Sequence, residues 1–130
     1  MRSKSRTGFT LIELLVVVVI IGILAAIAIP KFSSTKEQAY LSRMKSDLRN
    51  IATAQTAYEA DNQTYYNGVV PAAPLLYNPS PDVTITLSNV TQTGWAATAR
   101  HVGTPRTCVI YVGTGGPLAP ATVDGRVACT

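Results

Sequence analysis

The stretch GFTLIELLVVVVIIGILAAIAIP, residues 8–30, decides how this chain folds. It is apolar on every face, whereas a helix that lies on water shows one polar side, so we expect lipid or other protein to enclose it. Residues 14–29 carry no charge, and residues 9–12 extend the segment to the roughly 20 residues that cross a hydrocarbon layer as a helix. The stretch therefore predicts a membrane helix.

One charged residue, Glu13, lies inside this segment. A carboxylate in a membrane helix costs about 3 kcal/mol on insertion scales, and such residues usually face a partner or a functional site. The alternative is that Glu13 lies hydrated at the headgroup level of a simple anchor. Two interpretations of the helix follow, one with an assembly role for Glu13 and one without.

The polar leader before the segment contains no acidic residue and three basic ones, Arg2, Lys4 and Arg6. Positive charge before an apolar run holds the N-terminus in the cytoplasm. Residues 25–28, AAIA, could also be the small-residue site at which a secretory signal is cut after its apolar run. That alternative would remove the helix from the mature protein.

The start of the apolar run reads GFTLIEL at residues 8–14, and the run ends at Pro30. With the basic leader before it, this pattern closely resembles the type IV prepilin signature shared by type IV pilins and the pseudopilins of type II secretion. The resemblance implies that a prepilin peptidase cuts after Gly8 on the cytoplasmic side and methylates the new N-terminus at Phe9. The apolar helix is then kept in the mature chain.

Such a cut gives Glu13 a partner. It creates an α-amino cation on Phe9, one helical turn away from the carboxylate. When copies pack with a stagger, Glu13 of one chain can meet the Phe9 amine of another, and two buried charges are tolerated only when they are paired. Glu13 is therefore the expected assembly residue, and the pair would set the register between copies.

The C-terminal part of the apolar helix has two weak points, Gly22 and Pro30. Pro30 has no N–H to donate to the carbonyl of Ala26, so we expect a kink or a break there. The resemblance implies that this segment often unwinds in assembled fibres. For the isolated chain we expect an ordinary kinked helix.

Residues 31–62 are amphipathic, and charged residues, Asp47 among them, lie mostly off the apolar face. At 1.5 Å per residue a helix over residues 9–62 would be about 80 Å long, too long for a small domain to bury. Polymerisation is therefore expected from the geometry. The stripe that should pack on a sheet consists of Leu41, Met44, Leu48, Ile51, Gln55 and Tyr58.

The rest of the chain predicts a small antiparallel sheet. Prolines and a glycine make residues 64–81 a loop, which Tyr65, Tyr66 and Tyr77 should pin to the globular head. Alternating or apolar runs predict strands at residues 83–88, 95–102, 107–113 and 127–129. We expect the amphipathic helix to cover one face of this sheet, with Thr and Ser facing outward.

The expected fold is therefore α+β, a long helix on a small sheet, as in the ladle-shaped pilins that the resemblance implies. Its parts are a leader at residues 1–8, a transmembrane and assembly helix at 9–30 and an amphipathic helix at 31–62. A connecting loop and sheet head with a C-terminal disulfide loop occupy residues 63–130. The chain has two cysteines, Cys108 and Cys129, which lie outside the cytoplasm in this orientation and should form a bridge worth roughly 3 kcal/mol.

Charge and motifs indicate no enzyme. The net charge is +4, but without the leader eight basic side chains face seven acidic ones, so nothing calls for an acidic partner. The glycine-rich run at 113–117 has no following helix and reads as a turn, and His101 reads as a surface or strand residue. No catalytic residue, metal site or cofactor is expected. A basic patch of Arg100, Arg106 and Arg126 could contact DNA or a surface, although a solvated face is the simpler interpretation.

The resemblance implies a structural subunit of a type IV pilus, serving adhesion, twitching motility or DNA uptake. It would sit in the inner membrane as a single-pass protein and then in an extracellular fibre. Its implied partners are copies of itself, the prepilin peptidase, the inner-membrane assembly platform, the motor ATPases and the lipid bilayer. The alternative is a pseudopilin of a type II secretion system, and a third possibility is an unprocessed membrane anchor.

Overall fold

The computed structural model describes residues 8–75 and 77–130. By compactness the chain divides into two units, Met1–Lys36 and Glu37–Thr130, and α1 (Leu11–Asn62) contributes residues to both. The strands are β1 (Val83–Ser88), β2 (Gly94–His101), β3 (Thr107–Gly113) and β4 (Ala128–Cys129). One long helix followed by an antiparallel sheet is the α+β order that the sequence predicts.

In the N-terminal unit, α1 passes through Gly22 and Pro30 without interruption. The single chain therefore stays helical at these two positions, as expected for the isolated chain, and the unwinding in assembled fibres stays a prediction. Pro30 removes one backbone hydrogen bond, the one to Ala26. The bonds of the turns on both sides continue, and they are sufficient to keep the segment helical.

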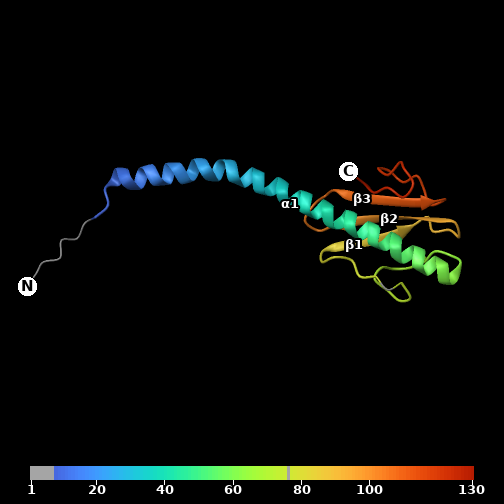
Figure 1. The fold of residues 1–130 in the computed structure, drawn as a ribbon. Coiled ribbons are helices and arrows are strands. Elements are labelled where there is room, and N and C mark those ends of the chain that lie inside the picture. Colours follow the sequence, from blue (N-terminus) through green and yellow to red (C-terminus); the bar gives the residue numbers. More distant parts are fainter. Residues whose placement is uncertain (1–7, 76) are drawn as a thin grey trace, which may run out of the picture. The chain divides into compact units, whose positions relative to one another are not determined.

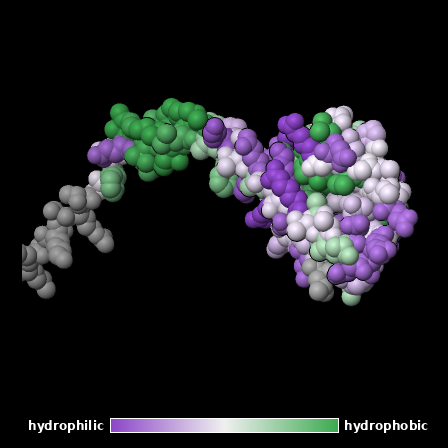
Figure 2. Space-filling model, turned by 45° about the vertical axis from the view of Figure 1, so that its right-hand side comes forward, coloured by the Kyte–Doolittle hydropathy of each residue, from purple (hydrophilic) through white to green (hydrophobic). Residues whose placement is uncertain are grey.

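The first half of α1 is apolar and uncovered. By length and composition, α1 is the one helix of the described residues that could cross a membrane, and no residue of its most apolar 18-residue window is buried. Figure 2 shows most of this half as hydrophobic surface on the face in view, with hydrophilic surface at its two ends. The residues of the chain that the structure describes therefore leave this surface for something else to cover.

The second unit is built on a four-stranded sheet in the order β1-β2-β3-β4, with every neighbouring pair antiparallel. In the register, Ala97 faces Ile110 across β2 and β3, and Cys108 faces Cys129 across β3 and β4. The C-terminal half of α1 lies against this sheet (Figure 1). The bounds of the first three strands agree with the predicted ones to within one residue. The fourth predicted strand, residues 127–129, is present as the two-residue β4.

The core lies between α1 and one face of the sheet. Met44, Leu48 and Ile51 are fully buried on the helix, and they pack in one cluster with Trp95 and Ile110 of the sheet. Leu41 and Tyr58, at the ends of the predicted stripe, are partly buried against the same cluster. The predicted stripe is confirmed.

The other face of the sheet differs from the expectation. Thr84 and Thr86 of β1 are exposed, as predicted, but Ala96, Val109 and Tyr111 of β2 and β3 are buried on that side. The segment after β3 covers them: Ala121 is buried in the same cluster. The Tyr111 hydroxyl donates to the carbonyl of Thr122 at 3.1 Å, and the backbone carbonyl of Tyr111 accepts the N–H of Gly125 at 2.8 Å. A C-terminal segment with little regular structure thus provides a third layer, which alternation within the strands did not indicate.

Cys108 and Cys129 form the expected disulfide, which ties the short β4 to β3. We predict that reducing it lowers the free energy of unfolding by roughly 3 kcal/mol, because the bond closes a loop whose ends are 21 residues apart. Urea unfolding of the detergent-solubilised full chain, followed by the fluorescence of the buried Trp95, measures this.

The double variant Cys108→Ser/Cys129→Ser is the control. It should match the reduced chain and should not respond to reductant. An unfolding midpoint of the parent chain that does not move on reduction would contradict the predicted contribution.

Candidate functional site

The predicted cleavage position lies just outside the helix. Gly8 and Phe9 are in neither a helix nor a strand, and the Phe9 side chain is 93% exposed. Proteases bind substrate backbone that is not already hydrogen-bonded in a helix, so this peptide bond has a suitable local conformation. The rest of the leader, with Arg2, Lys4 and Arg6, lies outside the described residues.

Thr10 and Glu13 form a capping box at the start of α1. The hydroxyl oxygen of Thr10 accepts the backbone N–H of Glu13 at 3.3 Å. In return, the Glu13 carboxylate accepts the backbone N–H of Thr10 at 2.8 Å and its hydroxyl at 2.7 Å. Two backbone donors that a helix start leaves free are thereby satisfied, which makes Thr10 the cap and places the helix boundary there.

The capping box gives Glu13 a role within one chain, which our sequence interpretation missed. The signal was present, because Thr followed three residues later by Glu before an apolar run is a sequence pattern of a capped helix start. Both bonds to the side chain end on Oε2. Among the described residues no donor reaches Oε1, so this oxygen remains available to a cation.

In the second unit, Asp47 holds the loop that connects the helix to the sheet. The residue is only 3% exposed. Its Oδ1 accepts the hydroxyls of Tyr77 at 2.8 Å and Ser80 at 3.0 Å, and its Oδ2 accepts the Ser80 N–H at 3.0 Å. Sequence analysis placed Asp47 off the buried face. Its spacing of three from Met44 and four from Ile51 was the signal that could have placed it there.

Gln55 makes a second connection to the same loop. Its amide donates to the carbonyl of Tyr66 at 2.9 Å and accepts the N–H of Tyr66 at 2.8 Å. The Tyr66 ring packs edge-on against Tyr58, and Tyr65 lies next to Trp95. The three loop tyrosines therefore pin the loop to helix and sheet, as predicted.

The three head arginines are not brought together by any contact within the described residues. Arg106 pairs with Glu37 at 3.8 Å and also bonds the carbonyl of Thr130. Arg100 and Arg126 are exposed on β2 and on the C-terminal segment. The basic patch for DNA or a surface stays a prediction.

His101 is a strand residue, but it is buried and not at the surface. Its ring stacks on Tyr40 at 4.1 Å between centroids, and its Nδ1 accepts the N–H of Gly103 at 2.9 Å. In the part of the chain that the structure describes, no group of three or more His, Cys, Asp or Glu side chains could hold a metal ion.

Comparison with known proteins identifies the N-terminal segment. The prokaryotic N-terminal methylation motif matches residues 3–29. Type II secretion system core protein G of Pseudomonas aeruginosa is 46% identical over 65 residues, which cover 50% of this chain and 46% of that protein. Core protein G of Klebsiella michiganensis is 40% identical over 65 residues, with the same coverage. The type IV major pilin protein PilA of Myxococcus xanthus is 48% identical over 58 residues, 45% of this chain and 26% of that protein.

These matches confirm the prepilin signature recognised in the sequence. The chain carries the N-terminal methylation motif, and about half of it is similar to a secretion pseudopilin and to a type IV pilin. The chain spans about half the length, or less, of these relatives. The matches do not separate a secretion-system protein from a pilin.

The contact between Tyr77 and Asp47 predicts a change of stability at alkaline pH. Burial of Tyr77, followed by its hydrogen bond to the Asp47 carboxylate, raises the pKa of Tyr77 well above its usual value of 10. Above pH 10 the unfolded chain loses this proton while the folded chain keeps it, so the free energy of unfolding falls as pH rises. Denaturant unfolding at pH 8 and at pH values above 10 measures the slope.

The matched variant is Tyr77→Phe, which lacks the hydroxyl. We expect a shallower decline above pH 10. At pH 8 the variant should be destabilised by about 1–3 kcal/mol, because buried Asp47 loses a donor. An alkaline slope equal to that of the parent chain would contradict the assignment.

Proposed function

We propose that this chain is the structural subunit of a cell-envelope filament, and in particular of a type IV pilus. The observation that carries the proposal is an exposed Gly8–Phe9 bond before a capped, uncovered apolar helix, within a matched N-terminal methylation motif. A prepilin peptidase would cut after Gly8 and methylate Phe9. The proposed role is structural, with no enzymatic activity.

The uncovered half of α1 is the physical reason for assembly. Removing apolar surface from water is favourable by roughly 25 cal/mol for each Å² of surface that is buried. Lipid of the inner membrane would cover this surface before assembly, and the helices of sister copies would cover it in the fibre. The assembly platform and motor ATPases would move the subunit from the first environment to the second.

Glu13 would pair with the Phe9 amine of a neighbouring copy. In this chain Oε2 of Glu13 is occupied by Thr10, whereas Oε1 has no donor among the described residues. A carboxylate held in this way can take a cation without losing the cap. In the fibre, the segment between Gly22 and Pro30 is where we propose that helix is lost, since one backbone bond is already missing there.

A pseudopilin of a type II secretion system is the second candidate, and a specific observation favours it. Core protein G relatives recur among the matches, and the first of them is 46% identical over the aligned half. The disulfide that closes the C-terminal segment supports the pilus, because such bridges are what the resemblance to pilins implies. The matched methylation motif covers residues 3–29, and the two candidates are not distinguished by it.

Three variants separate the charge of Glu13 from its capping role. Glu13→Gln can keep the capping box but has no charge, Glu13→Val has neither, and Thr10→Val loses the capping hydroxyl while Glu13 keeps its charge. An unpaired buried charge costs about 3–5 kcal/mol. We therefore expect the Gln and Val variants of Glu13 still to be cut before Phe9. Their yield of sheared fibre should be lower than that of the parent chain by about tenfold or more.

Thr10→Val should retain more fibre than either Glu13 variant. A normal fibre yield from Glu13→Gln would show that the charge pair is not needed. Equal losses in Thr10→Val and Glu13→Val would assign the effect of Glu13 to the cap.

Processing and filament type are tested in the native host. We expect mass spectrometry of the mature chain to find an N-terminus at methylated Phe9. Deletion of the gene should remove surface fibres and leave the secretion of folded exoproteins intact. Loss of secretion with surface fibres retained would favour the pseudopilin assignment over the pilin assignment. A mature chain that begins at Met1 or after Ala28 would overturn both assignments.

A further inference from the structure

The apolar half of α1 ends in an abrupt change of side chains. From Leu11 to Pro30 the helix has 20 residues, which span about 30 Å at 1.5 Å per residue and so match the hydrocarbon thickness of a bilayer. When this stretch crosses the membrane, Lys31 is the first residue beyond the hydrocarbon on the side away from the cytoplasm. Residues 31–36, KFSSTK, are all exposed, and we call them the boundary segment.

The boundary segment carries two cations that no described carboxylate neutralises. The sequence has no acidic residue between Glu13 and Glu37. Glu37 pairs with Arg106 of the head at 3.8 Å. Among the described residues, no carboxylate lies within ion-pair distance of Lys31 or Lys36. Both ammonium groups are therefore available to an external anion.

The ammonium group of Lys36 is directed toward the apolar half of the helix. Side chains of an α-helix lean toward its N-terminus, which here is the side of the membrane-spanning half. Lys36 shows this lean, because its Nζ lies 4.8 Å from the centre of the Phe32 ring, one turn closer to the apolar half. The Phe32 side chain is itself 63% exposed. The positive charge is thus held close to the level at which the apolar surface ends.

Two hydroxyl groups of the boundary segment are already bonded within the helix. Ser34 and Thr35 both donate to the backbone carbonyl of Lys31, at 2.9 and 3.0 Å. A polar group that has a hydrogen-bond partner costs less to remove from water than one without. The segment can therefore enter the headgroup layer of a bilayer with its lysines as the charged groups that seek partners there.

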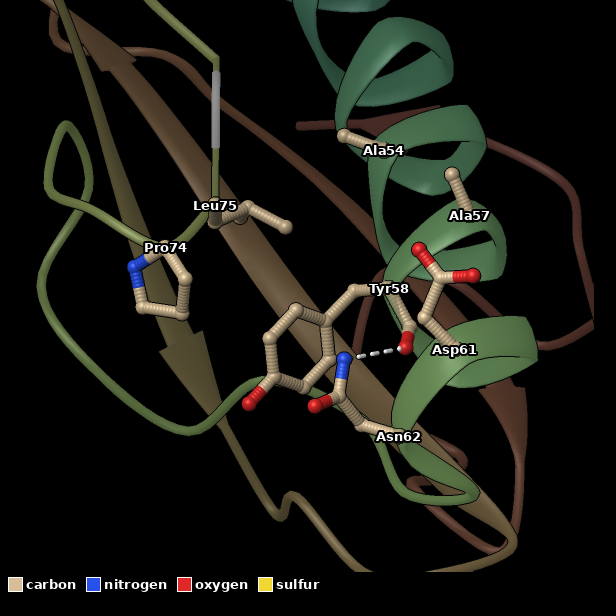
Figure 3. A pocket seen from close by; sticks show the side chains of 7 residues that line it. All are labelled: Ala54, Ala57, Tyr58, Asp61, Asn62, Pro74 and Leu75. Carbon is tan, nitrogen blue, oxygen red and sulfur yellow. Dashed lines mark hydrogen bonds between the residues drawn. The ribbon is translucent and has the colours of Figure 1, made fainter.

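The acidic end of α1 lies elsewhere. Asp61 is 25 residues after Lys36, in a last turn that has no basic residue. Figure 3 shows it beside Tyr58 and Asn62, with Pro74 of the connecting loop across a groove of about 320 Å³. The charged residues of α1 nearest its apolar half are thus cationic, and the charge at its C-terminal end is negative. An anionic surface at the boundary segment attracts the near charges and is remote from the acidic ones.

We propose that the boundary segment binds the headgroups of anionic phospholipids on the outer side of the membrane. Lys31 and Lys36 are five residues apart and so about 140° apart around the helix, so each ammonium group holds a headgroup of its own. Phe32 lies between them and enters the layer between the headgroups and the acyl chains. The inference rests on the membrane stage of the proposed function, and it fixes the depth at which the helix is held before assembly.

Lipid binding to the full chain tests this surface. Native mass spectrometry of the chain in detergent micelles counts the bound lipids when anionic phosphatidylglycerol or phosphatidylcholine, which has no net charge, is added. We expect two molecules of phosphatidylglycerol to bind more tightly than phosphatidylcholine, by about fivefold for each lysine, the equivalent of about 1 kcal/mol. Lys31→Gln and Lys36→Gln should each lose one of the two, and the double variant should lose the preference.

The matched control is Arg43→Gln/Arg49→Gln. It lowers the net charge by two, as the double lysine variant does, but both arginines are exposed on the part of α1 that belongs to the second unit. We expect this control to keep the preference for phosphatidylglycerol. An equal loss in both double variants would assign the preference to overall charge and would overturn the proposal.

Salt and membrane insertion complete the test. The preference of the parent chain should fall as the salt concentration rises, because exposed charges are screened. A parent chain that binds both lipids equally at low salt would overturn the role of the boundary segment and leave the filament function standing. A chain that does not insert into vesicles of either lipid would instead defeat the membrane helix, and the proposed function with it.

Discussion

The structure depends on an apolar helical surface that its own chain leaves uncovered. No residue in the most apolar window of α1 is buried, and the buried core is formed by the C-terminal half of the helix and the sheet. A segment that satisfies its own backbone hydrogen bonds as a helix is compatible with lipid, and equally with a bundle of identical helices. Membrane insertion and polymerisation are thus two ways to meet the same constraint.

The start of this helix combines two functions in a few residues. Thr10 caps α1 and leaves Phe9 outside it, exposed and in no regular structure. The same bonds orient Glu13 through one of its oxygens. Our sequence interpretation considered Glu13 either as one member of a charge pair between copies or as a hydrated residue at the headgroup level. The capping box adds a local role, which any explanation of a Glu13 substitution has to separate from the charge.

The head is organised by polar side chains of α1 that face inward. Asp47 and Gln55 are buried on the same face as Met44 and Ile51, and both bond the connecting loop. A buried carboxylate without hydrogen-bond donors would be costly. The loop residues that donate to Asp47 are therefore held against the helix. This arrangement explains how a loop rich in proline lies close enough to the helix to form a groove beside it.

The sequence by itself determined the apolar helix, the buried stripe of residues 41–58, the strand positions, the cysteine pair and the prepilin signature. Each of these is a local pattern, read from spacing along the chain. Only the tertiary structure decided the burial of Asp47 and the covering of Tyr111 by the C-terminal segment. Both depend on partners distant in sequence, such as Ser80 for Asp47 and Thr122 for Tyr111, and the spacing of residues along the chain does not show which distant segments meet.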